Sequence, residues 1–246
     1  MSQFGLPMTI GSSRNVSTFG ADSLPRSDQP QSIAEGSLRI ALVTTHSCVL
    51  GPGVRCVVWF QGCSLNCRGC IAAEMNEAPP LVTTTPVALA DWCGSIRGIQ
   101  GVTLSGGDPF DQPLDALADF LIHLRKQTSL NVMLYTGRTL SQLRSSECPD
   151  VATILTLVDI LIDGPYVESL NDGIGWRGSS NQRVHYLSDS RVFESDGGEV
   201  NRRLEVKLDA KGALSVVGLP ARGRAKQFAL QLLAGARGTC AAEASR

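Results

Sequence analysis

The sequence lacks an excess of either charge, and it has no dense block of basic residues. Its 246 residues carry 22 Lys and Arg against 23 Asp and Glu. Nucleic-acid-binding proteins concentrate positive charge on one face or segment. The composition therefore predicts that nucleic acid is not a partner.

Long apolar runs are also missing. The stretch from Val151 to Ile162 is interrupted by Thr156 and Asp159 and is too short to span a bilayer. The opening residues, MSQFGLPMTIGSSR, contain no basic segment followed by a continuous apolar run, so they do not resemble a secretory signal. We therefore expect a cytoplasmic protein without a membrane partner.

Catalytic histidine patterns are absent as well. The three histidines, His46, His123 and His185, show no metal-ligand spacing, and Ser105 has no G-x-S-x-G frame. We assign none of these side chains a catalytic role. The eight cysteines say more about function than the histidines do. Because the cytosol keeps thiols reduced, we expect them to bind metal, to catalyse or to be buried rather than to form disulfides.

The chain divides into three regions by composition. Residues 1–37 are rich in Ser, Gly, Gln and Pro without a sustained apolar period, which predicts a flexible leader. From Leu38 onward, β-branched and apolar segments begin, and we expect one domain over 38–220. The pattern of residues 221–246 predicts a helix followed by an Ala-rich tail.

Strand and helix patterns alternate through the central region. Two strands at 38–45 and 54–61 are expected to pair or to be neighbours. Later strands and helices follow one another, with strands at 101–105, 130–136 and 158–164 and helices at 86–98, 113–127 and 139–146. Such alternation predicts an α/β fold with a mostly parallel sheet. Two alternating segments around Asp209–Gly212 predict a small C-terminal β-hairpin.

Three cysteines stand close together as C-x3-C-x2-C, at Cys63, Cys67 and Cys70. This spacing could place them on one helix face, but Gly62, Ser64, Asn66 and Gly69 favour a loop. Three thiolates can hold three irons of a [4Fe-4S] cluster and leave the fourth iron without a protein ligand. S-adenosylmethionine can chelate such an open iron through its amino and carboxylate groups.

Other interpretations of these cysteines remain open. A structural zinc site would need a fourth ligand such as Cys56, Cys93 or His46. Unliganded thiols are the third interpretation. The five remaining cysteines lack partner spacing and are better explained as buried or incidental thiols: Cys48, Cys56, Cys93, Cys148 and Cys240.

A glycine pair follows the strand at 101–105, in the sequence Ser105, Gly106, Gly107 and Asp108. Parallel sheets bind ligands at the carboxyl ends of their strands, and an amino-acid group could be held there. For an isolated glycine pair, an ordinary βα turn that needs positive φ is the better explanation.

Further polar side chains follow later strands. Tyr135 and Thr136 close one strand and could approach a ribose or simply pack, and Asp163 closes the next strand as a site residue or as a turn former. Arg177, Asn181 and Arg183 in the turn-rich segment after it could hold a nucleoside or a protein partner, or be solvated. The G-x-G-x-x-G match at 173–178 lacks a preceding strand and is not interpreted as a nucleotide motif.

Together, these motifs resemble the radical S-adenosylmethionine proteins, and within them the activases of glycyl-radical enzymes, especially the anaerobic ribonucleotide reductase group. The resemblance covers most of residues 38–220 and includes TLSGGDPFDQP and IDGPYVESLNDGIGWRGSSNQR. It implies an incomplete TIM-like (βα) barrel of mostly parallel strands. Many radical enzymes carry an aromatic residue just before the third cysteine. This chain has Gly69 at that position, and the reductase activase group also has glycine there.

The resemblance also implies a cofactor site. It assigns Cys63, Cys67 and Cys70 to a [4Fe-4S] cluster, and it assigns Ser105–Asp108 to the amino group of S-adenosylmethionine. We add Tyr135 and Asp163 as expected cofactor-binding residues, and we assign no catalytic residue beyond the cluster ligands. The implied partners are a glycyl-radical enzyme as substrate and a low-potential electron donor such as flavodoxin.

Two competing functions follow from the same residues. One is a radical enzyme that modifies a peptide or a small molecule. The other is a zinc-stabilised binding or redox-sensing module without catalysis.

Overall fold

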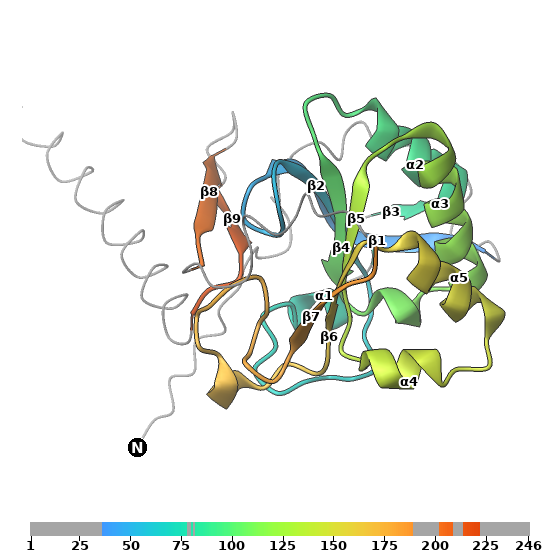
Figure 1. Cartoon of the computed structure of the whole chain (residues 1–246). Helices are drawn as coiled ribbons and strands as arrows, with labels where there is room; N and C mark the ends of the chain where they lie inside the picture. Colours follow the sequence, from blue (N-terminus) through green and yellow to red (C-terminus); the bar gives the residue numbers. More distant parts are fainter. Residues whose placement is uncertain (1–35, 78–79, 81, 189–201, 209–213, 222–246) are drawn as a thin grey trace, which may run out of the picture.

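The computed structural model describes residues 36–77, 80, 82–188, 202–208 and 214–221 (Figure 1). The expected leader lies outside the described residues apart from residues 36 and 37, and the expected tail lies outside them apart from Ala221. The turn of the expected C-terminal hairpin, at 209–213, is also outside them.

The described part of the chain contains a seven-stranded sheet and a two-stranded sheet. The strands are β1 (Leu38–Ser47), β2 (Arg55–Phe60), β3 (Val82–Thr84), β4 (Gly101–Gly106), β5 (Asn131–Tyr135), β6 (Ile160–Asp163), β7 (Arg183–Tyr186), β8 (Leu204–Leu208) and β9 (Leu214–Gly218).

Helices follow most of the parallel strands. They are α1 (Glu74–Glu77), α2 (Pro86–Ser95), η2 (Pro109–Asp111), α3 (Leu114–Gln127), α4 (Leu140–Arg144), α5 (Pro149–Leu157) and η3 (Glu168–Leu170), where η marks a 3-10 helix. Among the described helices, none combines the length and the apolar character that crossing a bilayer requires.

The large sheet has the strand order β3-β1-β2-β4-β5-β6-β7. Its four central strands, β2, β4, β5 and β6, are parallel to one another, while β1, β3 and β7 add antiparallel ladders at the two sides. The protein is therefore an α/β fold with a parallel centre, as the alternating pattern predicts. Since the carboxyl ends of the central strands share one edge, the loops that follow them meet there.

Helices α2, α3 and α5 cover one face of the sheet (Figure 1). The main core lies between them, because alternate strand residues such as Val58, Leu104 and Leu134 face the helices. The predicted apolar stripe of α3 is confirmed: Leu117, Leu121 and Leu124 are fully buried and Leu114 is partly buried. Trp92 of α2 belongs to this core.

The opposite face of the sheet carries two smaller clusters. Trp59 and Val57 of β2 pack with Val217 of β9, so the β8–β9 hairpin covers this face near β2 (Figure 1). Met133 and the β6 isoleucines form the second cluster, against which Trp176 packs. β2 is consequently buried on both faces along its whole length.

One charged side chain lies inside this structure. Arg55, at the start of β2, is fully buried. Its guanidinium donates to Thr103 Oγ1 at 2.7 Å, to the Val102 carbonyl at 2.8 Å and to the Pro52 carbonyl at 3.0 Å, and it also contacts Asn131. Burial lowers the pKa of Arg55 to about 10, so the group stays charged at neutral pH. Arg55 thus ties together the starts of three neighbouring strands.

The structure also contains elements that the periodicity does not predict. Helix α5 occupies part of the apolar stretch before β6, and β3 and β7 are short edge strands. Short edge strands of three or four residues carry too little alternation to stand out in a sequence. The predicted pairing of the first two strands and the C-terminal hairpin are confirmed as antiparallel ladders.

Candidate functional site

The three clustered cysteines lie in the loop that follows the carboxyl end of β2. Cys63, Cys67 and Cys70 are free thiols, each partly buried. Asn66 has a φ of 44° and Gly69 a φ of 72°, so the chain turns twice through left-handed conformations between the cysteines. The predicted loop, rather than a helix, is confirmed. We name residues 62–70 the cysteine loop.

Backbone N–H groups point at the sulfurs of this loop. Burial raises the pKa of the Cys63 thiol, while the N–H groups of Leu65 and Asn66 act in the opposite direction. Burial also raises the pKa of Cys70, and the nearby thiols of Cys67 and Cys63 add to that rise. N–H groups around sulfur atoms are the surroundings that an iron–sulfur cluster uses.

The glycine pair packs directly on the cysteine loop. The Gly107 N–H donates to the Phe60 carbonyl at 2.8 Å, and the Asp108 N–H donates to the Gly62 carbonyl at 3.0 Å. A Cβ on Gly107 would stand 1.9 Å from the Gly62 oxygen, and one on Gly106 would stand 2.6 Å from the Phe60 nitrogen. Both glycines are therefore required by close backbone approach, which a simple βα turn would not demand.

Asp108 joins the two loops that follow β4 and β5. Its carboxylate accepts hydrogen bonds from the Phe110 N–H at 2.9 Å, from Thr136 Oγ1 at 2.9 Å and from the Gly137 N–H at 3.1 Å. Arg138 adds an ion pair at 3.0 Å. Burial raises the pKa of Asp108, and the Arg138 charge partly offsets that rise. The side chain of Asp108 thus has a full set of protein partners.

Asp111 connects the same network to the cysteine loop. Its two oxygens accept from the Ser64 N–H at 2.6 Å and from the Ser64 hydroxyl at 3.0 Å, and Arg138 pairs with it at 2.6 Å. Although burial alone would raise it, the pKa of Asp111 lies below its usual value because Ser64 and Arg138 stabilise the carboxylate. Asp111 therefore holds the residue that follows Cys63.

Two more contacts shape the cysteine loop. Leu65 lies against Gly137, where a Cβ would come within 2.3 Å of its side chain. A Cβ on Gly69 would meet the Glu168 carboxylate at 2.8 Å. Glu168 thus lies where a side chain at position 69 would begin, but the φ of 72° at Gly69 is the stronger reason for glycine in place of an aromatic residue.

Tyr135 and Asp163 lie at the carboxyl ends of β5 and β6, with their polar groups already engaged. The Tyr135 hydroxyl donates to the Trp176 carbonyl at 2.8 Å, and burial raises its pKa. Asp163 accepts from the Leu140 N–H at 2.6 Å and lies 3.1 Å from His185 Nε2. The structure brings Ser105–Asp108 to the cysteine loop, whereas the Tyr135 hydroxyl and the Asp163 carboxylate contact other segments.

The zinc interpretation needs a fourth protein ligand, and the structure places the three candidates elsewhere. Cys56 and Cys93 contact each other in the core between β2 and α2. The His46 ring lies 3.0 Å from the Arg97 carbonyl. None of these side chains is part of the cysteine loop, so the loop offers three thiols and no fourth ligand from this set.

The three thiols fit an iron–sulfur cluster by their chemistry. Within the described ranges, no three His, Cys, Asp or Glu side chains already converge as a metal-ligand group. The loop nevertheless supplies three free thiols and sulfur-directed N–H groups, and none of the three candidate fourth ligands lies beside it; this is the donor set that a cluster with an open iron requires.

The sequence patterns do not predict Asp111, Ser64 or Arg138 as residues of the site. The TLSGGDPFDQP segment contains Asp111, but its partner Ser64 is 47 positions away and Arg138 is 27 positions away. Only the fold brings the three loops together at one edge of the sheet. The position of each residue just after a parallel strand is the signal that could have found them.

A loop of three thiols, packed on a glycine turn at the carboxyl edge of parallel strands, is the arrangement that the resemblance to iron–sulfur enzymes using S-adenosylmethionine implies. Residues 49–185 match the family described as a 4Fe-4S single cluster domain. This chain belongs to that family. Its cofactors are a [4Fe-4S] cluster and S-adenosylmethionine, and it is a radical S-adenosylmethionine enzyme.

The chain is also similar in sequence to curated proteins, and each of those described here is named anaerobic ribonucleoside-triphosphate reductase-activating protein. The Escherichia coli K12 protein is 31% identical over 146 residues, which cover 56% of this chain and 92% of the relative. The Vibrio cholerae protein is 32% identical over 145 residues, covering 56% and 90%. The protein of Enterobacteria phage T4 is 32% identical over 152 residues, covering 60% and 93%.

Proposed function

We propose that this enzyme activates a glycyl-radical enzyme, and that an anaerobic ribonucleoside-triphosphate reductase is its substrate. The observation that carries the proposal is the backbone packing of Gly107 and Asp108 on the cysteine loop. It supports a single site in which the cluster loop and an amino-acid-binding turn are fixed together. The names and identities of the relatives support the choice of substrate.

Cys63, Cys67 and Cys70 are our proposed cluster ligands. When bound, the cluster supplies the electron that cleaves S-adenosylmethionine to methionine and a 5′-deoxyadenosyl radical. The chain's own residues hold the loop in place: the Phe60 and Gly62 carbonyls accept from the glycine turn, and Asp111 binds Ser64. Rigid placement of this kind excludes competing reactions of a radical site.

Ser105–Asp108 are our proposed contacts for the amino group of S-adenosylmethionine. The Asp108 carboxylate already has protein partners, so we assign this contact to the backbone of the turn. For Tyr135 and Asp163 we propose a supporting role near the cofactor. Tyr135 fixes the segment around Trp176, and Asp163 fixes the start of α4.

We further infer that the central sheet is the wall of an incomplete TIM-like barrel within one domain at 38–220. Four neighbouring parallel strands with helices on one face support this view. A low-potential donor such as flavodoxin would supply the electron. We propose that the enzyme works in the cytoplasm without nucleic-acid or membrane partners, in line with its balanced charge.

Cluster chemistry can be tested on protein prepared without oxygen and reconstituted with iron and sulfide. The wild type should form 5′-deoxyadenosine only when a reductant is present. Cys67→Ala should lose both the visible cluster absorbance and the product. Cys148→Ala, which removes a partly buried thiol outside the loop, should keep both. A reduced cluster without product, or about one zinc and no iron, would refute the proposal.

The substrate can be tested separately by mixing the reduced enzyme with a purified anaerobic reductase from the same source. A glycyl-radical signal in the electron spin resonance spectrum is the expected result. Formation of 5′-deoxyadenosine without that signal would point to the competing function, in which a peptide or small molecule accepts the radical.

A further inference from the structure

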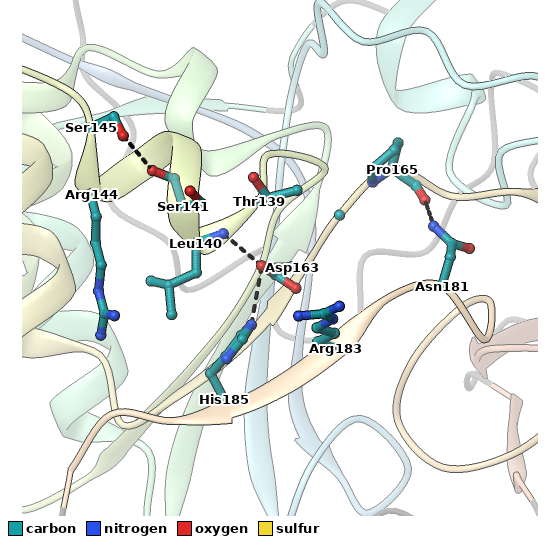
Figure 2. A pocket seen from close by; sticks show the side chains of 11 residues that line it. Thr139, Leu140, Ser141, Arg144, Ser145, Asp163, Pro165, Asn181, Arg183 and His185 are labelled. Carbon is teal, nitrogen blue, oxygen red and sulfur yellow. Dashed lines mark hydrogen bonds and ion pairs between the residues drawn. The ribbon is translucent and has the colours of Figure 1, made fainter.

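A cavity of about 650 Å³ opens on the helix-covered side of the sheet edge, between α4, the end of β6 and β7 (Figure 2). Its wall combines apolar groups, such as Leu140 and Pro165, with polar and charged side chains. The polar and charged lining residues include Thr139, Ser141, Ser145, Arg144, Arg183 and His185. No residue of the cysteine loop or of Ser105–Asp108 lines it. We name this cavity the α4 pocket.

Strand register places the α4 pocket on the helix face of the sheet. Leu161 faces the helical core, and Asp163, two residues later, faces the same way. β7 pairs with β6 so that His185 lies opposite Leu161 and Arg183 lies opposite Asp163. The β6 residues of the other face, such as Ile162, pack with Met133 instead. The pocket therefore lies on the side of β6 opposite to Ile162 and Met133, and Asp163 is the one lining residue that it shares with the residues proposed near the cofactor.

Among the side chains that line the α4 pocket, positive charges outnumber negative ones. Within the described part of the chain, the guanidinium groups of Arg144 and Arg183 form neither an ion pair nor a side-chain hydrogen bond. The one acidic side chain of the wall, Asp163, is only 6% exposed and accepts the Leu140 N–H. His185 Nε2 lies 3.1 Å from Asp163, but outside hydrogen-bond geometry, and has no hydrogen-bond partner.

The two arginines stand on different walls. Arg144 comes from α4 and Arg183 from β7, with Asp163 between them (Figure 2). The hydroxyls of Thr139, Ser141 and Ser145 lie along the α4 wall. A ligand with several acceptor oxygens can use both guanidiniums at once. A chain of phosphates offers such oxygens, and guanidinium forks bind them well.

We propose that the α4 pocket binds a phosphate-bearing small molecule of nucleotide size. Pockets for such ligands commonly measure about 300 to 1,000 Å³, and this cavity falls within that range. Arg144 and Arg183 hold the phosphate oxygens, and the Ser141 hydroxyl donates a further hydrogen bond, whereas the hydroxyls of Thr139 and Ser145 already donate to Gln142 Oε1 and to the Ser141 carbonyl. In the described part of the chain, no side chain of the pocket forms a hydrogen bond or an ion pair with the cysteine loop, so its binding can be measured apart from radical chemistry.

Binding can be measured by calorimetry on the cluster-loaded enzyme with S-adenosylmethionine at saturation, so that the cofactor site is filled. The probes are ATP, inorganic tripolyphosphate and adenosine, at near-physiological ionic strength to screen non-specific attraction. ATP and tripolyphosphate should bind, and adenosine should not. The double variant Arg144→Gln/Arg183→Gln should weaken binding by at least about tenfold, since each lost contact involves a charged group.

Arg97→Gln is the matched control, because Arg97 is an exposed arginine before β4, far along the chain from the pocket. It should leave the affinity unchanged. Melting temperatures of all variants check that the fold is intact, and 5′-deoxyadenosine formation is measured separately. Absence of binding, equal affinity of the double variant, adenosine binding as tight as ATP, or binding of a tetraglutamate peptide in place of the phosphates would each overturn the proposal.

Discussion

Asp111 is a single carboxylate that joins the loop after β4 to the cysteine loop. It accepts two hydrogen bonds from Ser64 and pairs with Arg138, which in turn pairs with Asp108. The cysteine loop is thereby fixed close to its first thiol. A change at Asp111 should affect cluster retention although the residue is not a proposed ligand.

Asp111→Asn should weaken this hold, because the amide keeps one acceptor oxygen and loses the charge that pairs with Arg138. Hydrogen bonds to charged groups contribute about 1.5 to 3 kcal/mol each, and part of that should be lost. The measurement is the rate at which cluster absorbance decays under an iron chelator, and we expect faster decay. Asp115→Asn, at an exposed position of α3, is the control, and equal decay of both variants would contradict this role.

Arg55 is the second residue whose environment leads to a prediction. Its buried guanidinium satisfies acceptors on three strands. Arg55→Met would leave those acceptors buried without donors, and each costs about 1 to 3 kcal/mol. We expect the free energy of unfolding in urea to fall by roughly 3 kcal/mol or more. Arg97→Met, on the surface, should change it by less than about 0.5 kcal/mol.

At the scale of elements, backbone hydrogen bonds between two loops fix the geometry of the candidate site. The turn after β4 donates to carbonyls at the end of β2 and just beyond it, so neither loop can move without the other. The glycine pair can therefore be recognised in the sequence, but the structural cause that requires glycine there cannot. A pattern of residue types does not reveal which backbone will lie against it.

Gly107→Ala should separate these loops, since its new Cβ would stand 1.9 Å from the Gly62 oxygen. The neighbour is backbone and cannot rotate away. We expect the variant to bind less iron and sulfide on reconstitution, as measured by metal analysis and visible absorbance. Gly94→Ala, within α2, should reconstitute like the wild type; normal cluster content in Gly107→Ala would show that the close approach is not needed.

Element prediction from the sequence succeeded where periodicity was long and failed where it was short. Helix α3 and the central strands follow from apolar spacing, and the pairing of β1 with β2 follows from their neighbouring apolar segments. Helix α5 did not, because its apolar residues run into β6 and hide the break at Val158. Likewise Asp163 was expected from its position after a strand, but its contact with α4 depends on tertiary structure.

At the scale of the whole molecule, one arginine just before the hairpin links two segments that are distant in the sequence. Arg202 donates to Asn171 Oδ1 at 2.8 Å and to the Gly178 carbonyl at 3.0 Å, and its side chain is only 4% exposed. Asp172 lies 3.6 Å away. The segment at 171–178 and the β8–β9 hairpin are thus coupled across the chain.

Arg202→Met should release this coupling. We expect faster amide hydrogen exchange at 171–179 and a loss of about 2 kcal/mol in the free energy of unfolding, because buried carbonyls lose their donor. Arg203→Met, its exposed neighbour, is the matched control. Unchanged exchange in Arg202→Met would mean that the segment is held by other contacts, such as the Tyr135 hydroxyl.

The parallel centre of the sheet and the loop conformation of the three cysteines could be anticipated from sequence. The α4 pocket could not, because Arg144, Asp163 and Arg183 meet only after α4 and β7 settle beside β6. Strand β7 has only four residues, which are too few for its register to be predicted from the sequence. Register alone puts Arg183 opposite Asp163.

Each of the three packed clusters happens to contain one tryptophan: Trp92 under the helices, Trp59 beneath the hairpin and Trp176 beside Met133. The chain has three tryptophans in all, so each cluster carries its own tryptophan fluorophore. Replacing any two with phenylalanine would leave one emitter reporting on one layer. Stepwise denaturation could then be followed optically, layer by layer, without attaching a dye.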